Sequence, residues 1–252
     1  RHFKHLTEGS FNTINDSMFA MLNGLKMVWV ISRHYNSDER MSPLMESIAK
    51  TLVKRVRGEV KLNDVFEMDF QDARRLVQEA GDVLVKWNTE YFNVRKKIED
   101  SGSDHRWEFD RKLLFGETDY IAEICANLLE IIDALDQFQK FLGPELKAVT
   151  GDSAGIDDVL QKVQGLTDPL KGLPYEDKIF DKQFDKEWMK IMKNFRTSVA
   201  EIEKMTEVFI KDSFRKLRSA EGAFELVQNF QKIGVNPPPP PSSGQVAAAA
   251  TS

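Results

Sequence analysis

Apolar residues recur every three or four positions through most of the chain, and no segment shows the strict alternation typical of a strand. This spacing predicts an all-α fold of elongated antiparallel helical bundles. A first helix is expected over residues 13–35 and a second after Asn36 or Ser37, either of which can cap it. Their apolar stripes are Ile14, Met18, Met21, Leu22, Leu25, Val28 and Trp29, and then Met41, Leu44, Met45, Ile48, Leu52 and Val56.

Two further segments carry heptad seams, in which apolar residues alternate at spacings of three and four. The first seam is Ala73, Val77, Ala80, Leu84, Trp87, Tyr91, Val94 and Ile98. The second is Ile121, Ile124, Leu128, Ile131, Leu135, Phe138 and Leu142, which ends at the helix stop Gly143-Pro144. We expect the two seams to pair as a long antiparallel hairpin. Their connection, residues 99–120, is rich in large apolar residues and is expected to pack over one end of the bundle.

A short helix is predicted over residues 156–166, and a long one begins near Asp185. The apolar residues of the long helix are Trp188, Met192, Phe195, Val199, Ile202, Phe209, Phe214 and Leu217. Glu207 with Lys211, and Asp212 with Lys216, are spaced for ion pairs along its surface. Residues 219–233 either continue this helix or form a last short one. Five prolines at 237–241 then mark a change of composition.

These patterns divide the chain into four segments. Residues 1–66 are expected to form an N-terminal helical hairpin, and residues 67–152 the long antiparallel helix pair with its aromatic connection. Residues 153–233 supply the C-terminal helices of the bundle, and residues 234–252 a disordered tail rich in proline and alanine.

Composition narrows the classes of function. The chain has 252 residues, of which 41% are hydrophobic, so it can bury a real core. Its net charge of -5 argues against binding to nucleic acid, which needs a basic surface. The single cysteine, Cys125, favours a reducing compartment, and no apolar run approaches the about 18 residues that span a membrane. No signal peptide is visible, and the start at Arg1 rather than Met indicates a segment of a longer protein.

Six acidic residues and no lysine or arginine lie between Leu113 and Gln139. They are Glu117, Asp119, Glu123, Glu130, Asp133 and Asp136. Such a face either recognises a basic partner or only keeps a helix soluble.

The sequence contains no motif that carries chemistry. The phosphate loop, the HExxH and GxSxG motifs and paired CxxC motifs are all absent from it. His2 and His5 fit one helical turn, but a metal site needs three or four ligands. We therefore expect no catalytic residue, no metal, no cofactor and no small-molecule ligand in this segment.

In the stretch VWVISRHYNSDERM at 28–41, an apolar helix ends in a polar turn. Folding alone does not require these particular residues in the turn. Together with other collinear motifs, it resembles the N-terminal tail of axonemal dynein heavy chains, most closely those of the outer arm. The further motifs are PLM at 43–45, Trp87 with YFNVR at 91–95, RWEFD at 106–110, TDY at 118–120, GPELKAVTGD at 143–152 and LRSAEGAF at 217–224. The resemblance covers residues 11–233, and from Gly234 onward the chain departs from the family.

The resemblance implies a structural and assembly segment. Such a tail docks dynein intermediate, light intermediate and light chains or another heavy chain, and transmits force in the axoneme of cilia and flagella. The ATPase of the parent motor lies elsewhere, so this segment is not expected to be an enzyme. Two other classes fit the helical pattern: a generic coiled-coil or spectrin-like cytoskeletal scaffold, and a helical regulatory binding domain.

Arginine and aromatic residues in connections are the best candidates for docking, because these residue types are enriched at interface hot spots. The candidates are Arg33, His34, Tyr35, Asp38, Arg40, Arg106, Trp107 and Phe109. The competing interpretation is that Tyr35, Trp107 and Phe109 simply close the ends of the bundle. Solvent exposure distinguishes the two interpretations.

Overall fold

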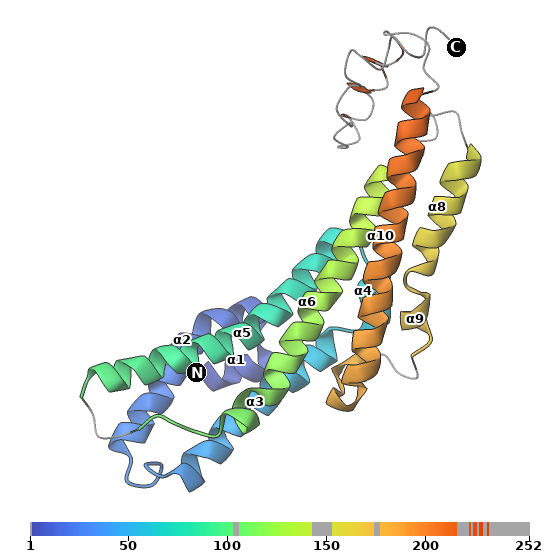
Figure 1. Cartoon of the computed structure of the whole chain (residues 1–252). Coiled ribbons are helices and arrows are strands. Elements are labelled where there is room, and N and C mark those ends of the chain that lie inside the picture. Colours follow the sequence, from blue (N-terminus) through green and yellow to red (C-terminus); the bar gives the residue numbers. More distant parts are fainter. Residues whose placement is uncertain are drawn as a thin grey trace. The chain divides into compact units, whose positions relative to one another are not determined.

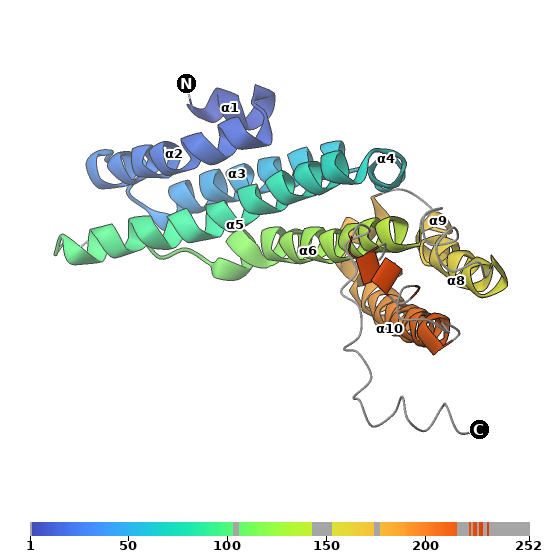
Figure 2. The ribbon, with the colours of Figure 1, turned by 90° about the horizontal axis from the view of Figure 1, so that it is seen from above.

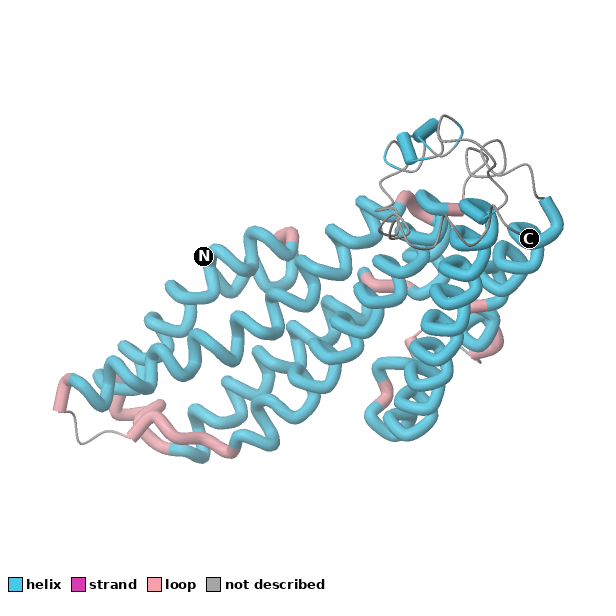
Figure 3. The backbone as a smooth tube through the Cα atoms, turned by 45° about the horizontal axis from the view of Figure 1, so that its top comes forward, coloured by secondary structure: helices cyan, strands magenta, loops and turns pink. Residues whose placement is uncertain are grey.

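The computed structural model describes residues 2–102, 106–142, 153–173 and 177–215, with positions 222, 224, 225, 227, 228 and 231. These residues form helices and loops and no strand, so the predicted all-α fold is confirmed (Figure 3). The predicted helix stop at Gly143-Pro144, the partner residue Lys216 and the tail 234–252 lie outside the described residues, as does most of 219–233.

The chain forms two compact units. The first comprises Arg1–Asp133 and Pro169–Met192, and the second Ala134–Asp168 and Lys193–Ser252. Two long helices, α6 (Arg111–Phe141) and α10 (Asp185–Arg215), contribute to both units. The segment boundaries at 66, 152 and 233 stay predictions, because a compact unit is not the same as a functional segment.

The first unit opens with α1 (His2–Glu8), α2 (Phe11–Ile31), α3 (Asp38–Glu59) and α4 (Leu62–Glu67). Ser10 caps α2 by accepting a hydrogen bond from the Thr13 amide at 3.3 Å. Arg55, near the end of α3, donates to the carbonyl oxygens of Thr7 at 2.6 Å and Gly9 at 2.8 Å. Because these carbonyls precede α2, the start of α2 lies beside the end of α3, and the two helices run antiparallel (Figure 2).

The predicted stripe of α2 is buried with one exception. Val28 is 39% exposed, so its assignment to the core was wrong. It lies seven residues after Met21, which is buried, and therefore on the same helical face. The helical phase was thus right, but Val28 lies at the edge of the buried face, which Trp29, at 5% exposure, continues. In α3 the predicted stripe is buried apart from the half-buried Leu44.

α5 (Phe70–Asp100) and α6 pair in opposite directions (Figure 1). Arg74 Nε donates to Asp133 Oδ1 at 2.7 Å, and Asn88 Nδ2 donates to Asp119 Oδ1 at 3.1 Å. Residues later in α5 therefore contact residues earlier in α6, which confirms the predicted antiparallel hairpin. Every residue of the first seam is buried, and so is every residue of the second except the half-buried Leu135.

Within the first unit, polar contacts attach the segment before α10 to α3 and α6. It contains α9 (Asp168–Lys171) and the 3-10 turns η1 (Lys178–Phe180) and η2 (Lys182–Phe184). The Tyr120 hydroxyl of α6 donates to the Ile179 carbonyl at 2.9 Å. Arg57 of α3 pairs with Asp177 at 2.8 Å and with Asp181 at 3.1 Å. Ile179 and Phe180 are buried between these anchors, and α10 begins at Asp185 as predicted.

In the second unit, α8 (Ser153–Gly165) and the later part of α10 run in opposite directions (Figure 1). Lys162 approaches Glu201 to 3.8 Å across the pair. The predicted stripe of α10 is buried at Phe195 and Ile202, and Glu207 pairs with Lys211 as expected. A groove of about 500 Å³ lies between the helices, lined by Asp158, Val159, Lys162, Glu201, Lys204, Met205, Val208 and Phe209.

Substitution of Gly24 tests the structure of α2. Gly24 lies in the middle of this helix, and a Cβ built there meets nothing within 4 Å. Gly24→Ala should therefore raise the free energy of unfolding by about 0.5–1 kcal/mol, measured by urea denaturation, because alanine costs less backbone entropy in a helix. Gly81→Ala is the control, since its Cβ would approach the Cβ of Cys125 to 3.2 Å. An equal gain in both variants would contradict this packing.

Burial raises the pKa of Tyr120 to about 12. Alkaline pH therefore tests the attachment that the Tyr120 hydroxyl makes to Ile179. The unfolded chain loses this proton near pH 10, while the folded chain keeps it, so the stabilisation is complete below pH 10 and is lost between about pH 10 and 12. The free energy of unfolding should fall more steeply across this window in the unmodified chain than in Tyr120→Phe. Parallel pH profiles for the two chains would show that Tyr120 ionises as freely in the folded state.

Candidate docking surface

The turn between α2 and α3 is organised by one residue, Ser32. Its amide donates to the Val28 carbonyl at 2.9 Å and ends α2. Its hydroxyl oxygen accepts from the amides of His34 and Tyr35, each at 3.3 Å. Its carbonyl accepts from the Asn36 amide at 3.1 Å. The backbone of the turn is therefore fixed by local hydrogen bonds, which is the usual role of serine in turns.

Three candidate docking residues contact one another on this turn. Arg40 Nη1 lies 2.8 Å from His34 Nε2, and the rings of His34 and Tyr35 pack edge to face with centroids 5.1 Å apart. Arginine can only donate, so Nε2 accepts and the ring proton belongs on Nδ1. The three side chains thus form an ordered polar and aromatic surface.

Exposure supports six of the eight candidates. Arg33, His34, Tyr35, Asp38, Arg40 and Arg106 are all exposed. Arg33, Asp38 and Arg106 form no ion pair with any residue in the described ranges. Their charges are thus available to a partner, and docking through them stays a prediction.

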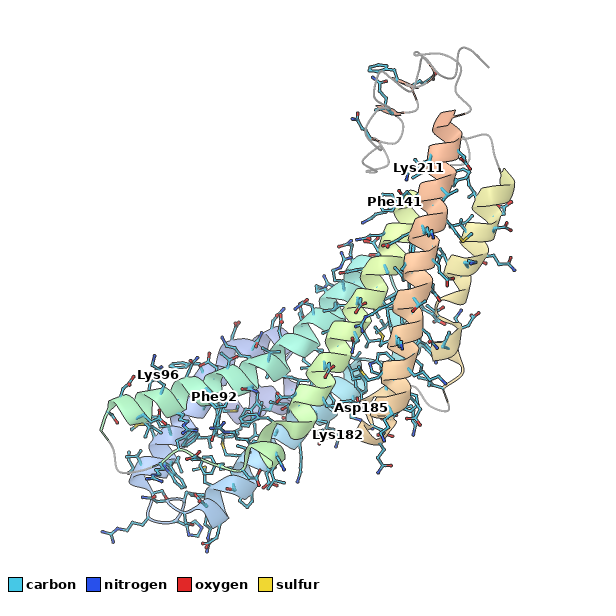
Figure 4. All side chains as sticks on the ribbon, viewed as in Figure 1. Phe92, Lys96, Phe141, Lys182, Asp185 and Lys211 are labelled. Carbon is cyan, nitrogen blue, oxygen red and sulfur yellow. The ribbon has the colours of Figure 1, made fainter. Side chains whose placement is uncertain are left out.

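Trp107 and Phe109 were wrongly placed on this surface. They are only 2% and 5% exposed and lie in the core. The Trp29 ring of α2 packs edge to face against both, at centroid distances of 6.3 Å and 5.2 Å. Large aromatic side chains gain most by such burial, so these two close the bundle end. We call Trp29, Tyr91, Phe92, Trp107, Phe109 and Phe115 the aromatic cluster; Phe92 is labelled in Figure 4.

The Tyr91 hydroxyl connects α5 to the 106–110 connection. It accepts from the Phe109 amide at 3.2 Å and lies 3.5 Å from the Trp107 carbonyl, to which it donates. Next to it, Trp87 Nε1 donates to the Leu114 carbonyl at 3.3 Å. A tyrosine hydroxyl is protonated at neutral pH and can donate, and burial raises the pKa of Tyr91 further above its ordinary value. The two Tyr91 bonds satisfy backbone groups of the buried connection, and the Trp87 bond ties α5 to the first turn of α6.

Removal of this hydroxyl tests its role in the fold. Tyr91→Phe leaves the buried Phe109 amide without its acceptor, so the free energy of unfolding should fall by about 1–3 kcal/mol. Urea unfolding followed by tryptophan fluorescence measures the change. The matched control is Tyr35→Phe, which alters an exposed tyrosine and should leave stability unchanged. A loss no larger than that of the control would contradict the proposed bridge.

Most of the predicted acidic face is used within the chain. Asp133 pairs with Arg74 at 2.6 Å, Asp119 accepts from Asn88, and Asp136 is buried and pairs with Lys140 at 2.8 Å. Glu117, Asp119, Glu123 and Glu130 are exposed. This distribution favours a structural and solubilising face over a docking site for a basic partner.

A second apolar surface on α2 was not predicted from the sequence. Phe19, Met27, Val30 and Ile31 are all exposed. The run MVWVI at 27–31 was the available signal, because a helix with one buried face cannot turn five consecutive residues toward the core.

Cys125, the cysteine of the chain, is poorly suited to nucleophilic chemistry. Burial raises the pKa of Cys125 to about 12, so the group remains a protonated thiol and a poor nucleophile. Among the residues the structure describes, no cluster of three potential metal ligands occurs. None of the described helices is both long enough and apolar enough to cross a membrane.

Comparison with known protein families identifies the family of the chain that carries this surface. The family model described as "Dynein heavy chain, N-terminal region 1" matches residues 1–239. The chain belongs to the dynein heavy chain family. The match extends past Gly234, so the expected departure from the family at that residue was placed too early.

Two similar relatives are axonemal or flagellar dynein heavy chains. The dynein-1-alpha heavy chain of the flagellar inner arm I1 complex of Chlamydomonas reinhardtii is 44% identical over 92% of this chain. Human dynein axonemal heavy chain 10 is 44% identical over 84% of it. This chain spans only 5% of the length of either relative.

The expected likeness to outer-arm chains finds no support in the comparisons. The dynein beta chain of the Chlamydomonas flagellar outer arm is 22% identical over 88% of this chain and 5% of its own length. That identity is half of the 44% found for the inner-arm I1 alpha chain. The motifs that suggested the family therefore do not distinguish its subtypes.

Proposed function

We propose that this segment is an assembly part of an axonemal dynein heavy chain tail. It docks intermediate or light chains, or another heavy chain, and transmits force from the motor in the cilium or flagellum. The observation that carries the proposal is the turn after α2 with the first turn of α3, residues 32–40, which holds exposed arginine and aromatic side chains in a fixed arrangement. A preordered surface loses little entropy on binding and is therefore suited to a permanent subunit contact.

The helical frame suits the mechanical part of this function. Paired long helices satisfy their backbone hydrogen bonds internally, and their interdigitated seams resist sliding. The α5 and α6 pair has both properties, with every seam residue buried except the half-buried Leu135. ATP hydrolysis is assigned to other parts of the parent protein, so this segment acts without chemistry of its own.

We further propose that the parent is an inner-arm heavy chain related to the I1 alpha chain. The identity of 44% to the I1 alpha chain, against 22% to the outer-arm beta chain, supports this choice. The axoneme is accordingly the proposed site of action.

Recovery of partners from ciliary extract tests the docking function. The 252-residue chain, immobilised as bait, should recover dynein intermediate chains or a second heavy chain, identified by mass spectrometry. The double variant Arg33→Ala with Tyr35→Ala should recover at least about tenfold less, because arginine and tyrosine at hot spots each contribute more than about 1 kcal/mol.

The matched control is Arg75→Ala, which removes an exposed arginine at the start of α5 whose partner Asp72 lies on the same helix. It should recover as much as the unmodified chain. Circular dichroism establishes that each bait is folded. A folded, unmodified bait that recovers no dynein subunit would argue against docking by this segment.

A further inference from the structure

α2 carries an outer stripe on the side of the helix away from its core. We define the outer stripe as Phe19, Met27, Val30 and Ile31, which are 42%, 46%, 38% and 70% exposed. Positions 19, 23, 26 and 30 are spaced by four, three and four residues, so they form one row along the helix, and 27 and 31 form the next row. Asn23 and Lys26 occupy the middle of the first row, so the exposed apolar residues gather at positions 27, 30 and 31, with Phe19 about two to three turns earlier. Exposed apolar residues grouped in this way mark interaction sites more often than a surface without them.

Positive charge borders the outer stripe. The Lys97 ammonium of α5 lies 4.0 Å from the centroid of the Phe19 ring. Lys26 lies in the same row as Phe19, and Arg33 is exposed two residues after Ile31. No acidic residue occurs in α2 after Asp16. A partner with negative charge beside its apolar residues would therefore complement this surface.

The geometry of the outer stripe fits a helix. From Phe19 to Ile31 the stripe extends about 18 Å, which equals the length of about three helical turns. The α2 backbone is hydrogen-bonded within the helix, so it offers no edge to an extended strand. Packing of side-chain ridges from a second helix is a mode of recognition that a helical apolar face of this length supports.

We propose that the outer stripe of α2 docks an amphipathic helix of a partner subunit whose apolar seam is flanked by acidic residues. This docking rests on the proposed function, from which it follows that the partner is a protein of the dynein assembly. A second copy of this chain fits less well. In a twofold contact of this face with itself, the positive borders would lie against each other.

A designed peptide tests the chemistry of the partner. The probe is a synthetic helix with a leucine seam and glutamate flanks, and its binding to the full 252-residue chain is measured by fluorescence anisotropy. The double variant Met27→Ser with Ile31→Ser should bind at least about tenfold more weakly, because two apolar contacts are lost. The matched control is Val85→Ser, which alters a residue on α5 that is 55% exposed and should bind the probe normally.

Charge is tested with a second peptide that has the same leucine seam and lysine flanks. The unmodified chain should bind the glutamate peptide more tightly than the lysine peptide. Lys97→Glu should narrow this preference or reverse it, and added salt should weaken binding of the glutamate peptide. Equal binding of both peptides to the unmodified chain would overturn the proposal, as would an equal loss of binding in Val85→Ser.

Sedimentation of the chain without peptide tests the alternative occupant. A dimer that dissociates in the Met27→Ser and Ile31→Ser variant would overturn the proposal, because a second copy would then occupy the outer stripe. The same variant is also used as bait in ciliary extract. Undiminished recovery of dynein subunits would refute the outer stripe as their docking site while the proposed function stands. Stripe-dependent peptide binding with no subunit recovered by the unmodified bait would support the outer stripe and refute the proposed function.

Discussion

The first unit depends on the burial of a connection that carries backbone polar groups into an aromatic core. Trp107 and Phe109 contribute large apolar surfaces, but the peptide groups between them cannot be buried without partners. The Tyr91 hydroxyl supplies the partner by accepting from one side and donating to the other. Since Tyr91 also belongs to the α5 seam, the same residue fixes the packing of α5, the path of the connection and hence the start of α6.

Much of this architecture follows from local sequence pattern. Seam residues such as Val77 and Ile124 were found from spacing alone, because an antiparallel pair of long helices buries whatever lies on one face. The connection was harder to predict. Spacing says nothing about a segment without regular structure, so the choice between exposed and buried states for Trp107 depended on long-range contacts with Trp29 and Tyr91.

The docking candidates also differ in whether their exposure depends on local sequence or on long-range contacts. Arg33 and Arg40 are exposed because the turn that holds them is set by neighbours in sequence, chiefly the Ser32 hydroxyl, and a local motif can be predicted from its residues. The outer stripe of α2 was missed because periodicity finds the face that a helix buries. It does not test whether apolar residues remain on the other side.

That remaining apolar surface requires an explanation beyond the stability of the chain itself. Trp29 points into the aromatic cluster, while Val30 and Ile31, the next two residues, are exposed on the outside of α2. A load applied to a helix docked on the outer stripe would therefore reach the core within one turn of backbone. Because a close-packed aromatic core yields little, it would pass the load on to α5 rather than absorb it. Under the proposed function, exposed apolar residues directly behind a buried tryptophan would anchor a subunit and carry its load into the core.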